Sequence, residues 1–248
     1  MVLHVLPPRT AGAAENMAVD FLLLQRYPSP DQPRFRSYAW RAPACTFGYA
    51  QKIAVVRTLL AAQPAPQGFD PDPATLDLCR RPTGGGLVDH RLDWTYALVI
   101  PRGHPLEESP APHSYRVIHE ALAAALQDQG VAAATKPAGE EEADPAGGVC
   151  FQRAEVHDVV QPATGEKIAG AAQKRNKHGL LFQGSVWRPA VTGRHPSFDW
   201  ERFEADFIAH LAAALGVAAS PTPWPEFNDE ELSALTEQYA SPEWRDFR

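Results

Sequence analysis

The chain has 248 residues, and 44% of them are hydrophobic, which is enough for the core of one large domain or two small ones. No run approaches the about twenty apolar residues of a transmembrane helix, and Met1–Thr10 lacks the apolar stretch of a signal peptide. We therefore expect a cytoplasmic protein that does not enter a membrane. The net charge of −7 argues against a general nucleic-acid binder, because phosphate contacts need clustered lysine and arginine.

The predicted elements alternate irregularly along the chain. In order, they are a helix over 15–27, strands over 34–40, 76–80 and 94–100, a helix over 114–129 that stops at Gly130, strands over 156–160, 167–173 and 179–187, and helices over 200–215 and 228–239. A proline-rich segment over 63–73 and an acidic segment over 135–148 are expected to be loops. Strands dominate the middle and helices flank both ends, so we predict an α+β fold with a mixed, mostly antiparallel sheet.

Three cysteines, Cys45, Cys79 and Cys150, are too few and too widely spaced for a disulfide framework in a cytoplasmic protein. The sequence contains no CxxC or HExxH motif, so we predict no metal site. Cys45 and Cys79 lie in strand-like segments and are expected to be small buried hydrophobes. Cys150 follows two glycines at a loop-to-strand junction, where a thiol is accessible; it is either a nucleophile or a structural residue.

The strongest local signal is a glycine triplet, Gly84–Gly86, within the segment 80–90. Three residues without side chains let a ligand approach the backbone and its N–H groups. The adjacent Arg81 is suited to pair with a carboxylate or a phosphate. The segment is neither a Walker loop nor a GxGxxG loop. The alternative interpretation is a hairpin tip with surface arginines.

Small residues also crowd the predicted strand over 167–173, where Gly170 and Ala171 follow Lys167. Such residues pack poorly in a strand and indicate that something approaches the sheet there. Lys167 is suited to hold an acyl carbonyl or phosphate, or to lower the pKa of a nearby thiol. The alternative is an exposed lysine at a strand end. The basic run over 174–178 is either a solvated turn or a docking patch for an acidic protein.

Together these segments resemble the biotin/lipoate protein ligase superfamily. Residues 80–90 resemble its RRxxGGGxVxH motif, and residues 167–173 resemble KIxGxAQ. Residues 15–20 are similar to its opening NMAxD helix, 43–51 to its PxxxxGxxQ segment and 183–185 to its QG-S/T step. The motifs occur in family order.

The resemblance implies an α+β fold shared with biotin ligases and related to class II aminoacyl-tRNA synthetases. The chain would then be a single catalytic domain over 1–248, in which residues 190–248 form helical cover; a separate helical subdomain is the alternative. Lys167 is implied at the acyl carbonyl or acyl-adenylate. The implied substrate-binding residues are Arg81, Gly84, Gly85, Gly86, His90, Gly170 and Ala171.

The family contains two chemistries, and Cys150 favours one of them. Octanoyltransferases pass an acyl group through a cysteine thioester, and Cys150-Phe151 before Lys167 resembles the Cys-Phe step of one transferase branch. We therefore predict an octanoyl- or lipoyltransferase with Cys150 and Lys167 as its catalytic residues, requiring no cofactor. The expected donor is octanoyl-acyl carrier protein or an acylated lipoyl protein, and the expected acceptor is a lysine of a lipoyl domain or glycine cleavage H protein.

Two alternatives remain open from the sequence. The first is a lipoate-protein ligase, which would activate lipoate with ATP and magnesium and in which Cys150 would be incidental. The short chain beyond the motifs argues against it, because many ligases carry an accessory domain there. The second is a non-catalytic protein that binds an acyl group or an acyl carrier.

Overall fold

The computed structural model describes residues 1–138 and 154–247 of the chain. Cys150 and most of the predicted acidic loop lie outside the described residues. None of the helices in these two ranges is long and apolar enough to cross a membrane.

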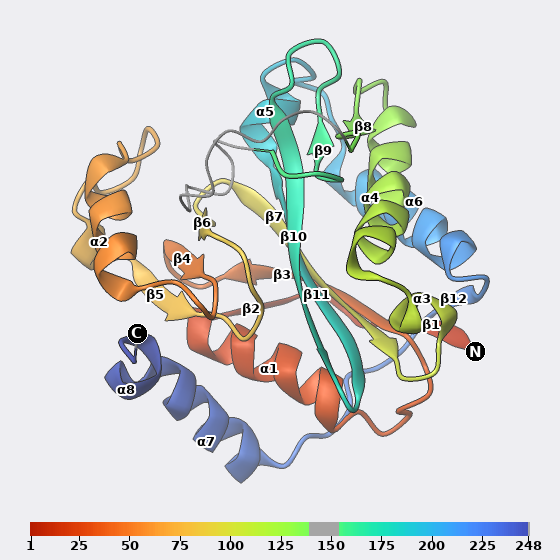
Figure 1. The fold of residues 1–248 in the computed structure, drawn as a ribbon, viewed down its shortest axis with the longest axis horizontal. Helices are drawn as coiled ribbons and strands as arrows, with labels where there is room; N and C mark the ends of the chain where they lie inside the picture. The colour runs from red at the N-terminus through yellow and green to blue at the C-terminus, as the bar shows by residue number, and fades with distance from the viewer. Residues whose placement is uncertain (139–153, 248) are drawn as a thin grey trace.

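A nine-stranded mixed sheet forms the centre of the molecule (Figure 1). Its strands are β1 (Val2–Val5), β2 (Arg9–Ala11), β3 (Arg34–Trp40), β7 (Asp93–Pro101), β8 (Ala134–Thr135), β9 (Val159–Val160), β10 (Lys167–Asn176), β11 (Gly179–Trp187) and β12 (Ala218–Pro221). Strands β3, β7, β11, β10, β9 and β8 are neighbours in that order and run antiparallel. The pairs of β1 with β3 and β12, and of β2 with β3, are parallel. The predicted α+β class and mostly antiparallel sheet are confirmed.

A second, smaller sheet stands beside the first and carries the glycine-rich segment. It consists of β4 (Ala44–Phe47), β5 (Asp77–Arg80) and β6 (Leu87–Asp89), with β4 in the middle. Helix α2 (Ile53–Ala62) and a short turn of 3-10 helix (Pro73–Thr75) connect β4 to β5. The sequence pattern did not predict α2 or the division into two sheets. The predicted proline-rich loop is confirmed, because residues 63–72 form no helix or strand and none of them is buried.

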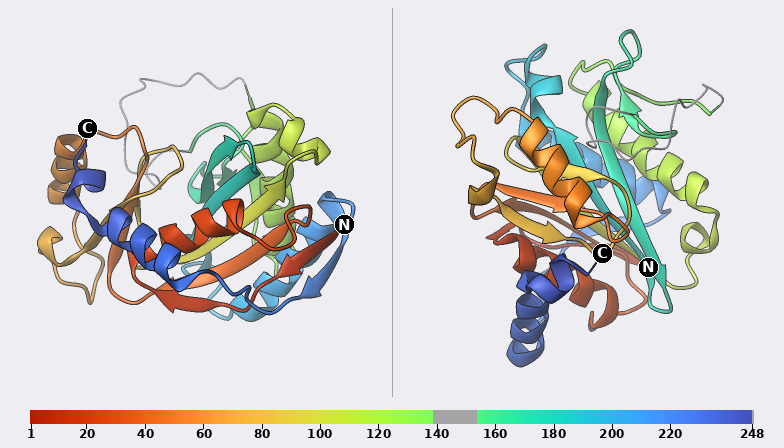
Figure 2. Two further views of the ribbon diagram at one scale, coloured as in Figure 1. Left: turned by 90° about the horizontal axis from the view of Figure 1, so that it is seen from below. Right: turned by 60° about the vertical axis from the view of Figure 1, so that its left-hand side comes forward.

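Helices cover both faces of the large sheet (Figures 1 and 2). The longer ones are α1 (Ala13–Gln25), α4 (Ala111–Gln127), α6 (Trp200–Ala214) and α7 (Asp229–Ala240), and the short ones are α3 (Pro105–Glu108), α5 (Arg188–Thr192) and α8 (Pro242–Arg245). Helices α4 and α6 pack together on one face, whereas α1 and α7 pack together on the other. The predicted stop of the second helix is confirmed, since Gly130 adopts a φ of +79° just beyond α4.

The central strand β7 contributes side chains to two hydrophobic cores, one on each face of the large sheet. Leu98 and Ile100 join the core beneath α4 and α6, while Ala97 and Val99 join the core beneath α1. Successive side chains of a strand point to opposite faces, so a strand covered on both sides reads as a continuous apolar run.

One predicted strand is too long. The segment 156–160 forms a strand only at Val159–Val160, because His157 adopts a left-handed φ of 71° that a strand does not accommodate. Its N–H instead donates to the carbonyl of Lys136. The predicted strand over 167–173 is confirmed and continues to Asn176, so most of the basic run belongs to the β10–β11 hairpin.

Candidate active site

The glycine-rich loop joins β5 to β6, and Arg81 supports it from within. The buried guanidinium donates hydrogen bonds to the carbonyl oxygens of Gly84 (2.6 Å from Nη2) and Gly86 (2.8 Å), and to the Thr46 hydroxyl (3.3 Å). Gly85 has a φ of +84°, and a Cβ there would lie 2.8 Å from the Arg81 Nη2, so only glycine fits. Arg81 thus holds the carbonyls of its own loop; the expected carboxylate or phosphate partner stays a prediction. The N–H groups of residues 84–86 have no acceptor among the described residues.

A pocket opens between this loop and the large sheet. It is lined by Met17, Tyr38, Trp40, Thr46, Arg81, Gly85, Val88, His90, Thr95, Gly170, Ala171, Ala172, Gln183, Gly184 and Ser185. Most of these residues present carbon atoms, and those from β10 project nothing longer than a methyl group. The pocket therefore suits an apolar ligand.

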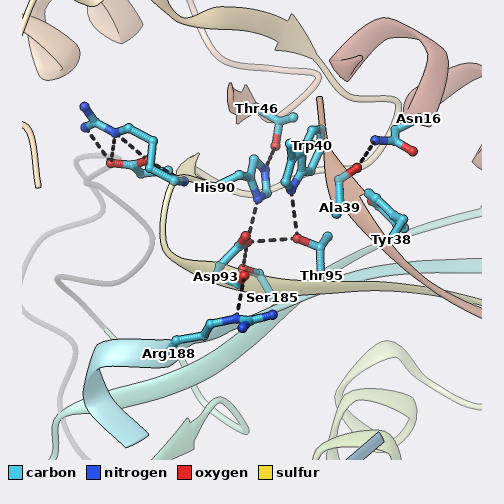
Figure 3. A network of polar contacts seen from close by, with 12 residues as sticks. Asn16, Tyr38, Ala39, Trp40, Thr46, His90, Asp93, Thr95, Ser185 and Arg188 are labelled. Carbon is cyan, nitrogen blue, oxygen red and sulfur yellow. Dashed lines mark hydrogen bonds and ion pairs between the residues drawn. The ribbon is translucent and has the colours of Figure 1, made fainter. Parts of the chain in front are cut away.

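His90 forms part of the pocket wall, with both ring nitrogens engaged (Figure 3). Nε2 lies 2.8 Å from the Thr46 hydroxyl, and Nδ1 lies 2.6 Å from the Asp93 carboxylate. The Trp40 ring stacks on the imidazole with a centroid distance of 4.1 Å. In this arrangement His90 orients the wall and the Trp40 ring and leaves neither nitrogen for a substrate.

Asp93, at the start of β7, is hydrogen-bonded to several residues of the same pocket wall (Figure 3). Besides His90, its Oδ2 accepts hydrogen bonds from the Thr95 hydroxyl (3.0 Å) and the Ser185 hydroxyl. The Thr95 hydroxyl in turn accepts from the Trp40 indole at 3.0 Å. The Asp93 side chain is fully buried, and its Oδ1 has no hydrogen-bond partner within the described ranges. Several donors on one oxygen offset the cost of burying this carboxylate.

Lys167 lies beside Gly170, which lines the pocket. Its Nζ forms an ion pair with the Asp158 Oδ2 at 2.6 Å, and the two side chains are only 4% and 7% exposed. A Cβ on Gly170 would lie 2.7 Å from the Lys167 Nζ and 2.9 Å from the Asp158 Oδ1. Gly170 therefore makes room for the ion pair as well as for a ligand.

A buried histidine fixes the segment that carries Asp158. The His119 Nδ1 lies 2.6 Å from the carbonyl oxygen of His157, the residue with the left-handed φ. The Lys136 N–H donates to the Asp158 carbonyl at 2.8 Å. Burial lowers the pKa of His119 and favours its neutral form. These contacts position the Asp158 carboxylate against Lys167.

The floor of the pocket rests on a second buried ion pair. Arg36 on β3 and Asp20 on α1 lie 2.6 Å apart, and both are almost completely buried. Gln183 donates to Asp20 at 2.7 Å and accepts from the Thr83 hydroxyl at 2.7 Å. Burial raises the pKa of Asp20, while the Arg36 charge opposes that shift. The network connects α1, β3 and β11 to the glycine-rich loop.

The two cysteines of the described ranges are poor nucleophiles. Cys45 and Cys79 are buried in β4 and β5, as predicted, and burial raises the pKa of both thiols. A raised pKa disfavours the reactive thiolate. Cys150 lies outside the described residues. Within those ranges, no group of three or more His, Cys, Asp or Glu side chains is arranged to hold a metal ion.

The structure brings the predicted site residues of the described ranges together around one pocket. Arg81, Gly85, His90, Gly170 and Ala171 line it, Gly84 and Gly86 contact Arg81, and Lys167 adjoins Gly170. The sequence interpretation missed Trp40, Asp93 and Asp158. Trp40 shares with Tyr38 the even spacing of one strand face, which was a usable signal, whereas neither carboxylate carries a local one.

The chain also matches known proteins. Residues 12–187 match the lipoyl protein ligase A/B catalytic domain, and this range covers most of the chain. The chain belongs to this family. The resemblance noted in the sequence is therefore confirmed.

Similar proteins include enzymes named octanoyltransferase LipM. The protein from Geobacillus kaustophilus is 34% identical over 179 residues, covering 70% of this chain and 60% of that relative. The chain thus spans about 60% of the length of this relative and of several other curated ones. The protein from Symbiobacterium thermophilum is 28% identical, and the match covers 93% of each chain.

Solved structures with this fold include lipoate protein ligases. A bipartite ligase from Thermoplasma acidophilum has a TM-score of 0.68 at 17% identity, covering 99% of this chain and 96% of that one. A lipoate-protein ligase A bound with ATP has a TM-score of 0.69 at 16% identity, covering 99% of both chains. At this level of identity the likeness establishes the shared fold.

Proposed function

We propose that this chain is an acyltransferase that moves an octanoyl or lipoyl group from a thioester donor, through Cys150, to a lysine of a lipoyl-domain protein. The observation that carries the proposal is the apolar pocket, which is lined by small residues of β10, among them Gly170 beside the buried Lys167. The relatives named octanoyltransferase, at 28–34% identity, support the same substrate class.

The pocket accounts for recognition of the acyl chain. Its β10 wall consists of Gly170, Ala171 and Ala172, and Trp40 and Met17 supply further apolar surface. Burying each CH₂ group contributes about 0.8 kcal/mol, so an eight-carbon chain gains several kcal/mol in such a pocket. A polar acid would forgo most of this gain.

The proposed reaction has two steps. The Cys150 thiolate attacks the donor thioester carbonyl; the acyl–sulfur bond to the donor breaks, and the donor thiol leaves with a proton. The ε-amine of the acceptor lysine then attacks the acyl-cysteine, an amide forms, the amine loses its proton and the Cys150 thiolate is regenerated. Thioester exchange followed by amide formation runs downhill, so this route needs no ATP and no metal.

Two groups next to the pocket suit the charges that develop. The Lys167 ammonium would stabilise the Cys150 thiolate and would attract the carbonyl oxygen of the thioester. The N–H groups of Gly84–Gly86, which have no acceptor among the described residues, are suited to the oxyanion of the tetrahedral intermediate. Because Arg81 holds the loop carbonyls, the loop keeps its shape while charge accumulates.

Intact-protein mass spectrometry after mixing with octanoyl-acyl carrier protein tests the proposal. We expect a gain of one octanoyl group that hydroxylamine removes and that is absent in Cys150→Ala. Cys45→Ala is the matched control and should retain the adduct, because that thiol is buried in β4. A lipoyl domain should then become octanoylated without ATP.

Two other outcomes would overturn it. An acceptor that gains mass only with free lipoate, ATP and magnesium would make the chain a lipoate-protein ligase. Binding of octanoate or of an acyl carrier without acylation from any donor would make it a non-catalytic binding protein.

A further inference from the structure

Two exposed aromatic side chains lie together beside the glycine-rich loop. Among the described residues, the exposed large hydrophobic side chains are Met1, Tyr49, Val55 and Phe247. Tyr49 and Phe247 are 37% and 41% exposed, and their ring centroids lie 5.3 Å apart. The Trp244 ring lies 5.9 Å from Tyr49 and 5.8 Å from Phe247. We call these three residues the aromatic platform.

The platform is held by Arg80 at the end of β5 and adjoins the glycine-rich loop. Arg80 donates to the carbonyls of Tyr49 (2.6 Å) and Trp244 (3.2 Å), and the Trp244 indole donates back to the Arg80 carbonyl at 2.8 Å. The Tyr49 N–H donates to the Thr83 carbonyl at 2.8 Å, one residue before the glycine triplet. The Phe247 ring lies 4.3 Å from the Arg80 guanidinium. The platform is thus a rigid surface that adjoins the loop.

Positive charge surrounds the platform in an otherwise acidic chain. The Lys174 Nζ lies 5.5 Å from the Tyr49 ring centroid, and Lys52 is exposed at the start of α2. Arg57 and Arg245 flank the platform as well, with Asp246 between them at 3.4 and 2.7 Å. The whole chain carries a net charge of −7, so this local excess of cations favours an acidic partner.

Strand β10 passes both places: Gly170 and Ala172 line the pocket, and Lys174 lies at the Tyr49 ring of the platform. Ala172 lines the pocket, and Lys174 points to the same face of the strand because side chains alternate. Lys174 lies four positions after Gly170, a distance of about 13 Å at about 3.3 Å per strand residue. A typical interface buries about 800 Å² per partner and is roughly 30 Å across, so one docked domain would cover both places.

Arg175 does not belong to this surface. It lies on the opposite face of β10, where it donates to the Ser109 carbonyl at 2.8 Å and lies 3.8 Å from Glu107. The basic run that the sequence suggested as one docking patch is therefore divided between two faces of the strand.

We infer that the aromatic platform with Lys174 is the docking surface for the acceptor protein, a folded domain whose modified lysine is flanked by acidic side chains beside a small apolar area. This inference rests on the proposed acyl transfer. A lysine reaches only as far as its four-carbon side chain, so the acceptor body contacts the surface next to the glycine-rich loop. An acyl carrier presents its thioester on a long flexible arm, so its body docks farther away.

The test separates the two half-reactions. Octanoyl-enzyme is prepared from octanoyl-acyl carrier protein, and its decay is followed with increasing concentrations of a lipoyl domain or with methylamine. For Phe247→Ser and Lys174→Glu we expect the KM for the lipoyl domain to rise roughly tenfold, as for interface anchors in general. The rates of octanoyl-enzyme formation and of methylamine acylation should stay at their wild-type values.

Arg202→Glu on α6 is the matched charge reversal away from the platform and should leave all three measurements unchanged. An unchanged KM for the lipoyl domain in both platform variants would overturn the inference. Slower octanoyl-enzyme formation with an unchanged acceptor KM would overturn it too, by assigning the surface to the donor. If the wild-type protein forms no octanoyl-enzyme, the proposed function fails instead, which is a distinct result.

Discussion

Two adjacent arginines serve opposite sides of the small sheet. Arg81 turns toward the pocket and holds the carbonyls of the glycine-rich loop. Arg80 turns away and donates to the carbonyls of Tyr49, Gln51 and Arg245, which join the start of α2 to the C-terminal helix. Successive residues at the end of a strand point to opposite faces, so one Arg-Arg step supplies both regions.

The Arg-Arg step of the family motif therefore serves both the pocket and the stability of the fold. Both guanidinium groups are buried, at 0% and 5% exposure, and their hydrogen bonds given above go to backbone carbonyls, with one to a hydroxyl. Hydrogen bonds from a charged group contribute about 1.5–3 kcal/mol each, so either arginine is costly to replace. On the Arg81 side we expect a substitution mainly to slow the reaction, and on the Arg80 side mainly to lower stability. The following variants test this difference.

On the pocket side, Lys167→Met should have the largest effect. It removes the cation that we propose acts beside the reaction centre, and we expect octanoyl-enzyme formation to slow by about 10²–10³-fold, as for the loss of one transition-state contact. Single-turnover mass spectrometry measures the rate. Lys177→Met, on the exposed hairpin tip, is the control and should react as the wild type does. A wild-type rate for Lys167→Met would remove this residue from the mechanism.

Replacing each arginine by lysine should show directly that the two arginines have different roles. Lysine lacks the planar fork, so Arg81→Lys should let the loop shift and slow octanoyl-enzyme formation by about 10²-fold. Arg80→Lys should instead lower the free energy of unfolding by about 2–4 kcal/mol and leave that rate near the wild-type value. Urea unfolding and the single-turnover rate are measured on both variants. Equal losses of rate and stability in the two would refute the division.

Gly170→Ala should affect the pocket side more mildly. The added Cβ meets the Lys167–Asp158 ion pair, and we expect overpacking to lower stability by about 1–3 kcal/mol and to slow the reaction. Gly84→Ala is the stability control, because a Cβ there meets no atom within 4 Å. Comparable stability losses in both variants would argue that the ion pair moves aside without cost.

The smallest effect concerns His119 and pH. Its pKa is lowered by burial, so below its ordinary pKa the unfolded chain takes up a proton that the folded chain does not. Stability is therefore lost as pH falls from the unfolded pKa toward the lowered folded one. Urea unfolding at pH 7.5 and 5.5 should show a smaller loss for His119→Gln than for the wild type. An equal loss in both would show that other groups cause the pH dependence.

Strong periodicity made most of the longer elements predictable. The strand over 94–100 and the helix over 200–215 match β7 and α6 within one residue at each end. Helix α2 was missed, because Lys52 at its start offers no capping side chain and the segment carries no clear stop signal. Strands β1 and β12 are four residues long and are paired with each other from opposite ends of the chain, which no local pattern encodes.

The sequence alone determined the chemical inventory: the glycine triplet, the small residues around Lys167, and the order of motifs that identified the family. Those signals are local, because backbone freedom and side-chain size are properties of single residues. Only the tertiary structure decided which groups meet. Asp158 against Lys167, Ser185 against Asp93, and the C-terminal aromatic rings against Tyr49 are contacts between separate segments. Burial makes these contacts energetically important, and burial exists only once the sheets and helices have packed.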